Sequence, residues 1–482
     1  MHGRHRTPNT ATAPRAHGRT RWSLLLVLSV AQLMVILDIS AVNVALPDLA
    51  SDLNIPHSDI GWTITSYSLI FGSLLLFGGR AADLLGRRRV FLTGLAVFTA
   101  SSLVTALAAD AAMLFAARAG QGLGAAMLSP AALSIITRTF HGPERAKALG
   151  VWGAVGGAGA AIGVLLGGVL TELVDWRAIF FINLPVGVLV AAGAAHLLPA
   201  DTARPQWRGL DLRGALLATA SLGTLVYALS QAQSSGWTST QTLGLGAAGL
   251  TGLAVFAALE LRTVQPLLRV QRLADRAVGG GFAMMLAASA VLFGSFLLSS
   301  LYLQNVLGTG ALETGLAFLP FAVAIGAGVH AAGHVITHAG VRIPLAGGFA
   351  IAAAGMLLLS RVSAHGSYAA DVLPGMFVAG IGLGIILVSV SVSVLTGAAD
   401  HESGMLSGLN TTGHEIGGSL GIAILATIAA GAAGPTAAAA IGDAFLVAAI
   451  IAGVASAAAL VILPSARTFL PKLALAPRVA VH

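Results

Sequence analysis

The stretch from Leu24 to Pro47 reads LLLVLSVAQLMVILDISAVNVALP, which is long enough to cross a lipid bilayer as one α-helix. It carries a single acidic residue, Asp38, inside an otherwise apolar run. A charge in hydrocarbon is unfavourable by a few kcal/mol, so an acid retained there marks a candidate functional site. Burial away from water favours the neutral form of a carboxyl group. We therefore expect Asp38 to gain and lose a proton as the protein works.

The composition indicates a polytopic membrane protein. Of the 482 residues, 56% are hydrophobic and 9% are charged, whereas soluble domains contain about 25% charged residues. The chain has no cysteine, which excludes disulfide bonds and thiolate metal sites. The net charge of +7 does not indicate nucleic acid as a partner, because most basic residues fall in short gaps between apolar runs, where membrane orientation accounts for them.

Apolar runs of roughly 18 to 25 residues predict an all-α protein with fourteen membrane-spanning helices. The predicted spans centre near Leu33, Leu69, Ala100, Gly124, Gly159, Gly187, Gly223, Thr251, Phe293, Ile325, Ala352, Leu383, Gly418 and Val454. We group them as 6+2+6, since transporters are often built from related halves with the substrate site between them. The predicted units are a basic tail (1–21), an N-terminal six-helix bundle (22–199), a two-helix insertion with flanking linkers (200–275), a C-terminal six-helix bundle (276–466) and a second tail (467–482).

The distribution of charge predicts the orientation. Arginines and lysines gather in alternate gaps, and acids gather in the others, so the basic side is expected to face the cytoplasm. Both tails then lie in the cytoplasm, and the chain is expected in the cytoplasmic membrane. One predicted inside gap, which contains Asp400 and Glu402, is acidic and is an exception to this rule.

The gap between the second and third spans carries a recognisable motif. Residues 79–89 read GRAADLLGRRR, in which glycines allow a tight turn at the membrane face. This spacing is similar to the signature of the major facilitator superfamily. The resemblance implies the fold of that superfamily, here with fourteen helices, and assigns Gly79, Asp83, Gly86 and Arg87 to a conformational latch. The alternative is a basic inside loop with incidental glycines.

A buried arginine is predicted in the fourth span. Arg118 lies in the segment 114–126, LFAARAGQGLGAA, and a guanidinium cannot shed its proton, so burial requires water or a counter-charge. The segment resembles the fourth-helix motif of the superfamily, which implies a role for Arg118 in proton coupling, with Asp38 as a candidate partner. The alternative is an arginine that extends from a helix end toward the interface.

The fifth span is rich in glycine. Residues 152–168 read WGAVGGAGAAIGVLLGG, and glycines at every fourth position form a smooth face for close helix packing. The segment also resembles the antiporter motif of the superfamily. Its glycines are matched by Gly159, Gly163, Gly167 and Gly168, whereas Val164 stands where the motif has proline.

Further segments resemble the fourteen-helix drug:proton antiporters of the superfamily. They include the motif around Asp38 and Asn43 in the first span, and residues 175–187, 302–304 and 403–418. The resemblance implies that Asp38, Arg118 and Asn43 serve proton coupling or substrate binding. An acid in the thirteenth span, Glu415, is a candidate for binding cationic drugs or a second proton, and a solvated helix-end charge is its alternative.

Histidines do not indicate a metal site. His330, His334 and His338 share one helical face at a spacing that could bind a metal, but no acidic or cysteine partner lies near them in the sequence. We therefore expect no metal.

The sequence predicts a transporter rather than an enzyme. No P-loop occurs and no large soluble domain is present, so we expect no cofactor and a proton gradient as the energy source. The expected function is export of lipophilic or cationic small molecules in exchange for protons, by a chain that acts as a monomer in the bilayer. A narrow exporter of an endogenous metabolite or self-made antibiotic is the alternative, and a non-transporting membrane sensor or scaffold is a remote one.

Overall fold

A computed structural model describes residues 18–56, 59–201, 205–206, 211–396, 398–399, 402–429 and 436–474. Most of the two predicted tails, together with Asp400 and His401, lies outside the described residues. The described part consists of helices joined by short connections, and it contains no β-strand.

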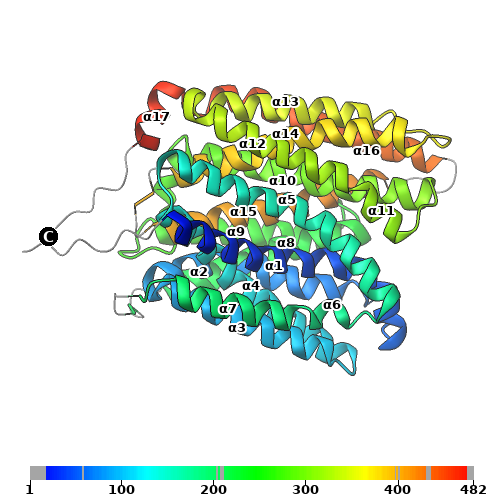
Figure 1. Cartoon of the computed structure of the whole chain (residues 1–482), viewed down its shortest axis with the longest axis horizontal. Coiled ribbons are helices and arrows are strands. Elements are labelled where there is room, and N and C mark those ends of the chain that lie inside the picture. The colour runs from blue at the N-terminus through cyan, green and yellow to red at the C-terminus, as the bar shows by residue number, and fades with distance from the viewer. Residues whose placement is uncertain are drawn as a thin grey trace, which may run out of the picture.

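The first half of the chain forms one group of helices, drawn from blue to green in Figure 1. Within this group α2 and α3 pack on α4, and α1 packs on α5 and α7. Its members are α1 (Gly18–Asp52), α2 (Trp62–Leu85), α3 (Arg87–Ala106), α4 (Ala111–Thr139), α5 (Gly142–Leu173), α6 (Ala178–Phe181) and α7 (Asn183–Leu197).

The last part of the chain forms a second group, drawn from yellow-green to red in Figure 1. Here α14 packs on α12 and α13, α10 packs on α15, and α16 packs on α10 and α13. Its members are η2 (Val270–Ala274), α10 (Val278–Leu301), η3 (Tyr302–Val306), α11 (Ala311–Ala317), α12 (Leu319–Ala339), α13 (Arg342–Leu359), η4 (Tyr368–Val372), α14 (Leu373–Leu395), α15 (Ser403–Ala429), α16 (Ala437–Ile462) and α17 (Ala466–Ala474).

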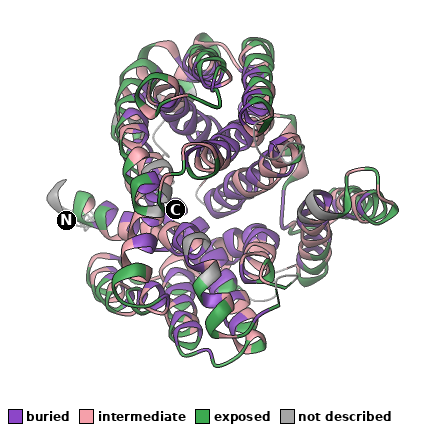
Figure 2. Cartoon of the chain, turned by 90° about the vertical axis from the view of Figure 1, so that its right-hand side faces the viewer, coloured by how far each residue is buried: buried purple, intermediate pink, exposed green. Residues whose placement is uncertain are grey.

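Two helices stand apart from both groups. They are α8 (Leu212–Ser235) and α9 (Thr240–Glu260), which pack on each other. Of the two, α8 also contacts α2 and α15, and the pair projects to one side when the molecule is viewed along its helices (Figure 2). These two helices correspond to the predicted insertion, whose boundaries remain a prediction.

Twelve described helices or helix pairs are long and apolar enough to cross a membrane. The two remaining predicted spans fall on α5, with 32 residues, and α15, with 27 residues. Helix α5 is rich in glycine, and α15 carries the polar run from Asn410 to Glu415. They nevertheless pack among the spanning helices, because α5 contacts α1 and α12 and α15 contacts α2 and α10.

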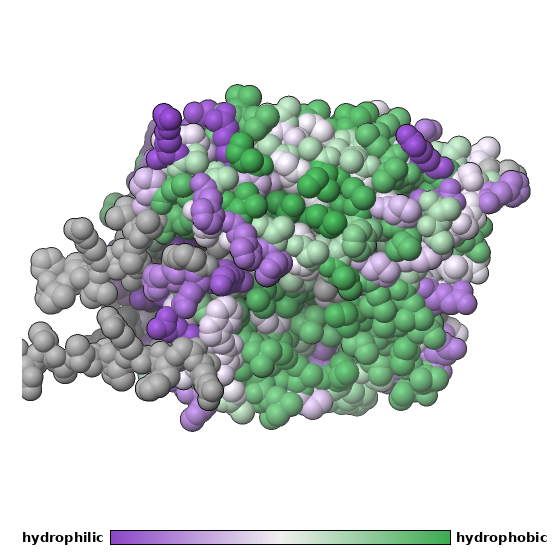
Figure 3. All heavy atoms as spheres, turned by 45° about the horizontal axis from the view of Figure 1, so that its top comes forward, coloured by the Kyte–Doolittle hydropathy of each residue, from purple (hydrophilic) through white to green (hydrophobic). Residues whose placement is uncertain are grey.

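The surface agrees with a membrane protein. Hydrophobic residues cover most of the middle of the face shown in Figure 3, and hydrophilic residues gather toward its two ends. Large apolar side chains are well exposed on several helices, which suits contact with lipid rather than water. Examples are Leu26, Val188, Leu189, Leu216, Val323 and Val454.

The two groups meet mainly through α2 against α15 and α5 against α12. The end of the bundle where α2 is followed by α3 is called the latch end below. The first described residues of α1 and the last of α17 lie at this same end (Figure 1). Its assignment to the cytoplasm remains a prediction.

Candidate functional site

Asp38 lies in the interior of the first helix group and is only 1% exposed. Its carboxylate is paired with the guanidinium of Arg118, whose Nη1 donates a hydrogen bond to Oδ2. The other oxygen, Oδ1, accepts hydrogen bonds from Nε2 of Gln121 (2.8 Å) and Nδ2 of Asn183 (3.0 Å). Every one of these groups donates to Asp38, an arrangement that suits an ionised carboxylate.

The guanidinium of Arg118 has both hydrogen-bond partners and aromatic neighbours. Its Nε donates to the backbone carbonyl of Thr63 (3.1 Å), and Nη1 also donates to Oε1 of Gln121 (2.9 Å). The guanidinium carbon lies 4.6 Å from the ring centre of Tyr67 and 5.8 Å from that of Phe180. A cation over aromatic faces is stabilised when water is excluded, so these rings help to keep the arginine buried.

The residues that connect the pair to neighbouring helices were not predicted from the sequence. Ser102 on α3 accepts hydrogen bonds from Gln121 (2.8 Å) and Asn183 (3.2 Å), which ties α3, α4 and α7 to the same carboxylate. Gln121 and Asn183 lie within the motif segments 114–126 and 175–187. Their signal was a polar amide inside an apolar span, but nothing in the sequence shows which helices are neighbours.

The glycines of α5 bring α1 close. A methyl group at Gly159 would lie 3.0 Å from Cγ2 of Ile36, and one at Gly167 would lie 2.7 Å from the Cα atom of Ala41. A methyl group at Gly163 would collide with Oγ of Ser40. These positions therefore tolerate little more than hydrogen, and the glycine face of α5 fixes the helix that carries Asp38. Gly168 is buried on the same helix.

At the latch end, Asp83 joins the two helix groups. Its Oδ1 accepts a hydrogen bond from the backbone N–H of Gly404 (3.0 Å), and its Oδ2 accepts one from Met405 (2.9 Å). These N–H groups belong to the first turn of α15, so Asp83 at the end of α2 caps a helix of the opposite group. Arg87 completes the arrangement, since its Nη2 donates to Oδ1 of Asp83 (2.5 Å) and to Oγ of Ser403 (2.9 Å).

The glycines of the latch motif have distinct structural reasons. A side chain at Gly79 would collide with the carbonyl oxygen of Gly404, so α2 and α15 cross with their backbones in contact. Gly86 has φ of +107°, a conformation that other residues rarely adopt, and a methyl group there would meet the carboxylate of Asp201. Asp201 in turn accepts a hydrogen bond from the N–H of Arg89 (3.0 Å) at the start of α3.

The ion pairs of Glu402 explain in part why one predicted inside gap is acidic. Glu402 directly precedes α15 and is buried, and its carboxylate pairs with Arg269 (2.8 Å) and Arg272. The two arginines lie in the linker that follows α9, so they neutralise the acid and tie that linker to the first turn of α15.

Glu415 lies on α15 and faces α2. A methyl group at Gly72 would be 3.9 Å from its Cβ atom. Its carboxylate makes no ion pair or hydrogen bond with any described residue, and it is half-buried, which differs from the fully paired Asp38. The adjacent His414 contacts Oγ of Ser289 (2.6 Å) through Nδ1. The structure does not bring Glu415 into the Asp38 network, although Tyr67 lies within electrostatic range of both acids.

Asn43 and the three histidines at positions 330, 334 and 338 lie on two different helices. Asn43 lies on α1, but its side chain is outside what the structure describes. His330, His334 and His338 are exposed on α12, and Nδ1 of His334 and of His338 lies 3.1 Å and 3.0 Å from the carbonyl oxygen four residues earlier. In the part of the chain that the structure describes, no group of three or more metal-ligating side chains converges.

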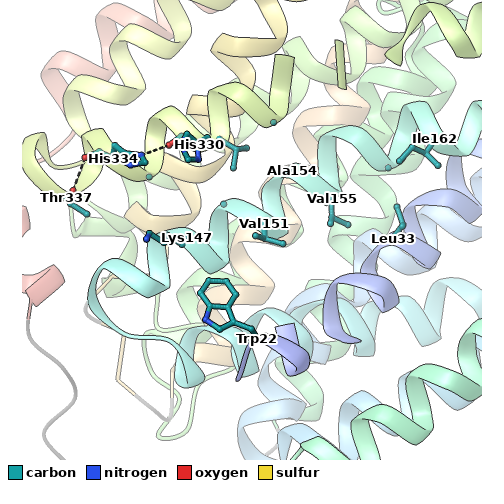
Figure 4. Close-up of a pocket in the computed structure, with 15 residues that line it drawn as sticks. Trp22, Leu33, Lys147, Val151, Ala154, Val155, Ile162, His330, His334 and Thr337 are labelled. Atoms are coloured by element: carbon teal, nitrogen blue, oxygen red, sulfur yellow. Dashed lines mark hydrogen bonds between the residues drawn. The ribbon is translucent and has the colours of Figure 1, made fainter. Parts of the chain in front are cut away.

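A cavity of about 770 Å³ lies between the two helix groups and is lined by residues of α1, α5 and α12 (Figure 4). Its walls in the middle of the bundle are apolar, with Leu33, Val155 and Ile162 among them. Toward the latch end the lining becomes polar, through Lys147, His330, His334 and Thr337, with Trp22 beside them. Neither Asp38 nor Glu415 lines this cavity. Its volume is within the usual range for sites that bind small molecules.

The comparison with protein families decides the identity of the fold. The model described as Major Facilitator Superfamily matches residues 28–422, well over half of the chain. The chain belongs to the major facilitator superfamily. It is therefore a multi-pass membrane transporter and not an enzyme, as the resemblance of its motifs implied.

Curated relatives within this superfamily include exporters of antibiotics. The puromycin resistance protein pur8 of Streptomyces alboniger is 40% identical over 417 residues, which cover 86% of this chain and 82% of that protein. The cephamycin export protein CmcT of Amycolatopsis lactamdurans is 38% identical, covering 88% and 86%. The tetracenomycin C resistance and export protein of Streptomyces glaucescens is 30% identical, covering 86% and 77%.

A solved structure shares the superfamily fold. The human organic anion transporter MFSD10 (TETRAN) superimposes with a TM-score of 0.63, covering 91% of this chain and 99% of that one at 15% sequence identity. At this identity the similarity concerns the fold alone.

Proposed function

We propose that this transporter exports small lipophilic molecules, antibiotics among them, across the cytoplasmic membrane in exchange for protons. Alternating access moves the substrate, and the proton gradient supplies the energy without any cofactor. The membrane potential adds about 2.3 kcal/mol per charge per 100 mV when net charge crosses the bilayer. The latch end faces the cytoplasm in this proposal, and a single chain is sufficient.

The observation that carries the proposal is the buried pair of Asp38 and Arg118. Titratable groups are rare in membrane interiors, and they commonly belong to proton or substrate pathways. Arg118 keeps its charge, so only Asp38 can change its state within the pair. Protonation of Asp38 would remove its charge attraction to Arg118 and weaken its hydrogen bonds with Gln121 on α4 and Asn183 on α7. Gain of one proton could thereby change the packing of the first helix group.

The latch supports the alternating movement. Asp83 and Arg87 join the ends of α2 and α15 from opposite groups. Opening this end requires their hydrogen bonds to be broken, and closing restores them. Such an arrangement has two discrete states, which a transporter needs in order to expose a site to one side at a time.

The test uses sealed vesicles that contain the purified protein and an internal pH-sensitive dye. Puromycin, a cephamycin and tetracenomycin C are added in turn, and we expect at least one to evoke a proton flux. Asp38→Asn should abolish that flux while the protein still inserts normally. The matched control is Asp443→Asn, which removes an exposed acid from α16 and should change nothing. Normal coupled transport by Asp38→Asn would remove Asp38 from the mechanism, and failure of a broad panel to evoke any flux would overturn proton exchange.

A narrow substrate range is the second candidate. The relatives from Streptomyces and Amycolatopsis carry the names of single compounds, which suits exporters of one antibiotic. Susceptibility of a host strain to a chemically diverse panel separates the candidates. Protection against one structural class favours the narrow exporter, and protection against several favours a multidrug exporter.

A further inference from the structure

The cavity along α1, α5 and α12 has a distinct polarity along its length. Its deeper walls are apolar, and its polar side chains gather toward the latch end (Figure 4). A ligand that fills such a space without leaving polar groups unpaired needs an apolar body and one polar end.

Among the lining residues that the structure describes, the polar end of the cavity carries a positive charge and no acid. Lys147 supplies an ammonium group, and no aspartate or glutamate is among the described residues that line the cavity. The nearest acid along α5 is Glu144, one turn before Lys147, and it pairs with Arg21 (3.6 Å) instead of lining the cavity. Asp38 and Glu415 do not line the cavity either.

His334 adds a ring nitrogen that can form a hydrogen bond with an acidic group of a ligand. A carbonyl oxygen only accepts hydrogen bonds, so Nδ1 of His334 must donate to the carbonyl of His330. The other ring nitrogen, Nε2, is then an acceptor when the ring is neutral and a donor when it is charged. It can accept from a carboxylic acid or a phenol, and as a cation it can donate to a carboxylate.

We propose that this cavity binds amphipathic organic acids, with the apolar body against Leu33, Val155 and Ile162 and the acidic group beside Lys147 and His334. The inference rests on the proposed export function and narrows its substrate class. It departs from the lipophilic cations that the sequence analysis considered, because a cationic end would meet Lys147 without a counter-charge.

Binding of two probes with the same apolar body tests this selectivity. The probes are diphenylhexatriene carrying a propionate group and diphenylhexatriene carrying a trimethylammonium group. The full chain is reconstituted in phosphatidylcholine vesicles without a pH gradient, and energy transfer from tryptophan to the probe is measured. Signals from vesicles without protein are subtracted. We expect the propionate probe to bind at least tenfold more tightly than the ammonium probe.

Variants connect the preference to the cavity. Lys147→Glu should lower the ratio of the two affinities at least tenfold, and Lys147→Gln should lower it less. His334→Leu should weaken the propionate probe, whereas His338→Leu is the matched control, since His338 lies on the same helix outside the lining and should leave the ratio unchanged. Equal affinity for the two probes, or an equal effect of the Lys147 and His338 variants, would overturn the inference.

The outcome is separable from that of the proposed function, because the binding measurement involves no proton movement. A drug-evoked proton flux without a preference for the anionic probe leaves proton-coupled export in place and rejects the acid-binding cavity. An anionic preference without any proton flux rejects the coupling and keeps the cavity.

Discussion

The carboxylate of Asp83 accepts a hydrogen bond from the backbone N–H of Gly404, although the two residues belong to different helix groups and are 321 positions apart in the chain. Together with the bond from Met405, this contact makes a side chain of α2 the cap of α15. A helix cap is normally supplied by the residue before the helix. In the proposed movement, the capping residue would leave with α2 when the latch end opens.

Asp83→Asn should favour the open latch. Loss of the charge weakens both the cap and the pair with Arg87, by about 1 to 2 kcal/mol for a lost cap, which changes the ratio of the two states roughly 5- to 30-fold. The native chain has no cysteine, so spin labels on cysteines introduced at Glu144 and Arg467 report the separation of α5 and α17 at this end. A longer distance should become more populated. An unchanged distance distribution would show that the cap does not hold the closed state.

Gly79→Ala should destabilise the crossing of α2 and α15. The added methyl group meets the carbonyl oxygen of Gly404, and overpacking of this kind typically costs about 1 to 3 kcal/mol. The melting temperature of the purified protein, followed by near-ultraviolet circular dichroism, should fall. Gly347→Ala on α13 is the control, because a methyl group there meets nothing within 4 Å and alanine favours a helix. Equal melting temperatures for the two variants would contradict this account.

Gln121→Leu should impair coupled transport even though glutamine does not titrate. The substitution removes a donor to Asp38 and the acceptor that Arg118 uses, and each hydrogen bond to a charged group is worth about 1.5 to 3 kcal/mol. The drug-evoked proton flux in vesicles is the measurement. Thr224→Val on α8, whose hydroxyl donates only within its own helix, should leave the flux intact. A normal flux in Gln121→Leu would show that the amide merely fills space.

Two variants of Tyr67 test the contributions of its ring and of its hydroxyl group separately. Its hydroxyl oxygen is buried and has no hydrogen-bond partner among the described residues, so Tyr67→Phe should be neutral or should stabilise the protein by up to about 1 kcal/mol. Tyr67→Leu removes the ring that covers Arg118 and should cost about 0.5 to 2 kcal/mol. Thermal unfolding of both variants tests the order. Destabilisation by Tyr67→Phe would indicate that the hydroxyl has a partner, such as water.

The sequence was sufficient for the overall class of fold because apolar length is a direct requirement of the bilayer. Asp38 and Arg118 were recognisable for the same reason, since a charge inside an apolar run is expensive wherever the helix lies. The partners of these residues could not be predicted. Ser102 and Asn183 are ordinary polar residues until the helices are placed side by side, and their importance depends on contacts between segments that are far apart in the chain.

Only one of the two segments that form the latch could be predicted from the sequence. Its motif in residues 79–89 is local, so Gly79, Asp83, Gly86 and Arg87 were found together. The groups that Asp83 binds are backbone N–H groups, which every residue except proline has, and no side chain at Gly404 or Met405 could indicate them. The cavity was missed for a similar reason, because its lining is contributed by three helices whose residues are mostly aliphatic or glycine.

Helix α1, which packs on α5, carries residues of both the buried ion pair and the cavity. Because the glycines of α5 leave room for Ile36, Ser40 and Ala41, α1 packs closely against α5. The same helix carries Asp38 on one side and Leu33, which lines the cavity, on another. A movement of α1 caused by protonation of Asp38 would therefore also displace Leu33 and change the dimensions of the cavity.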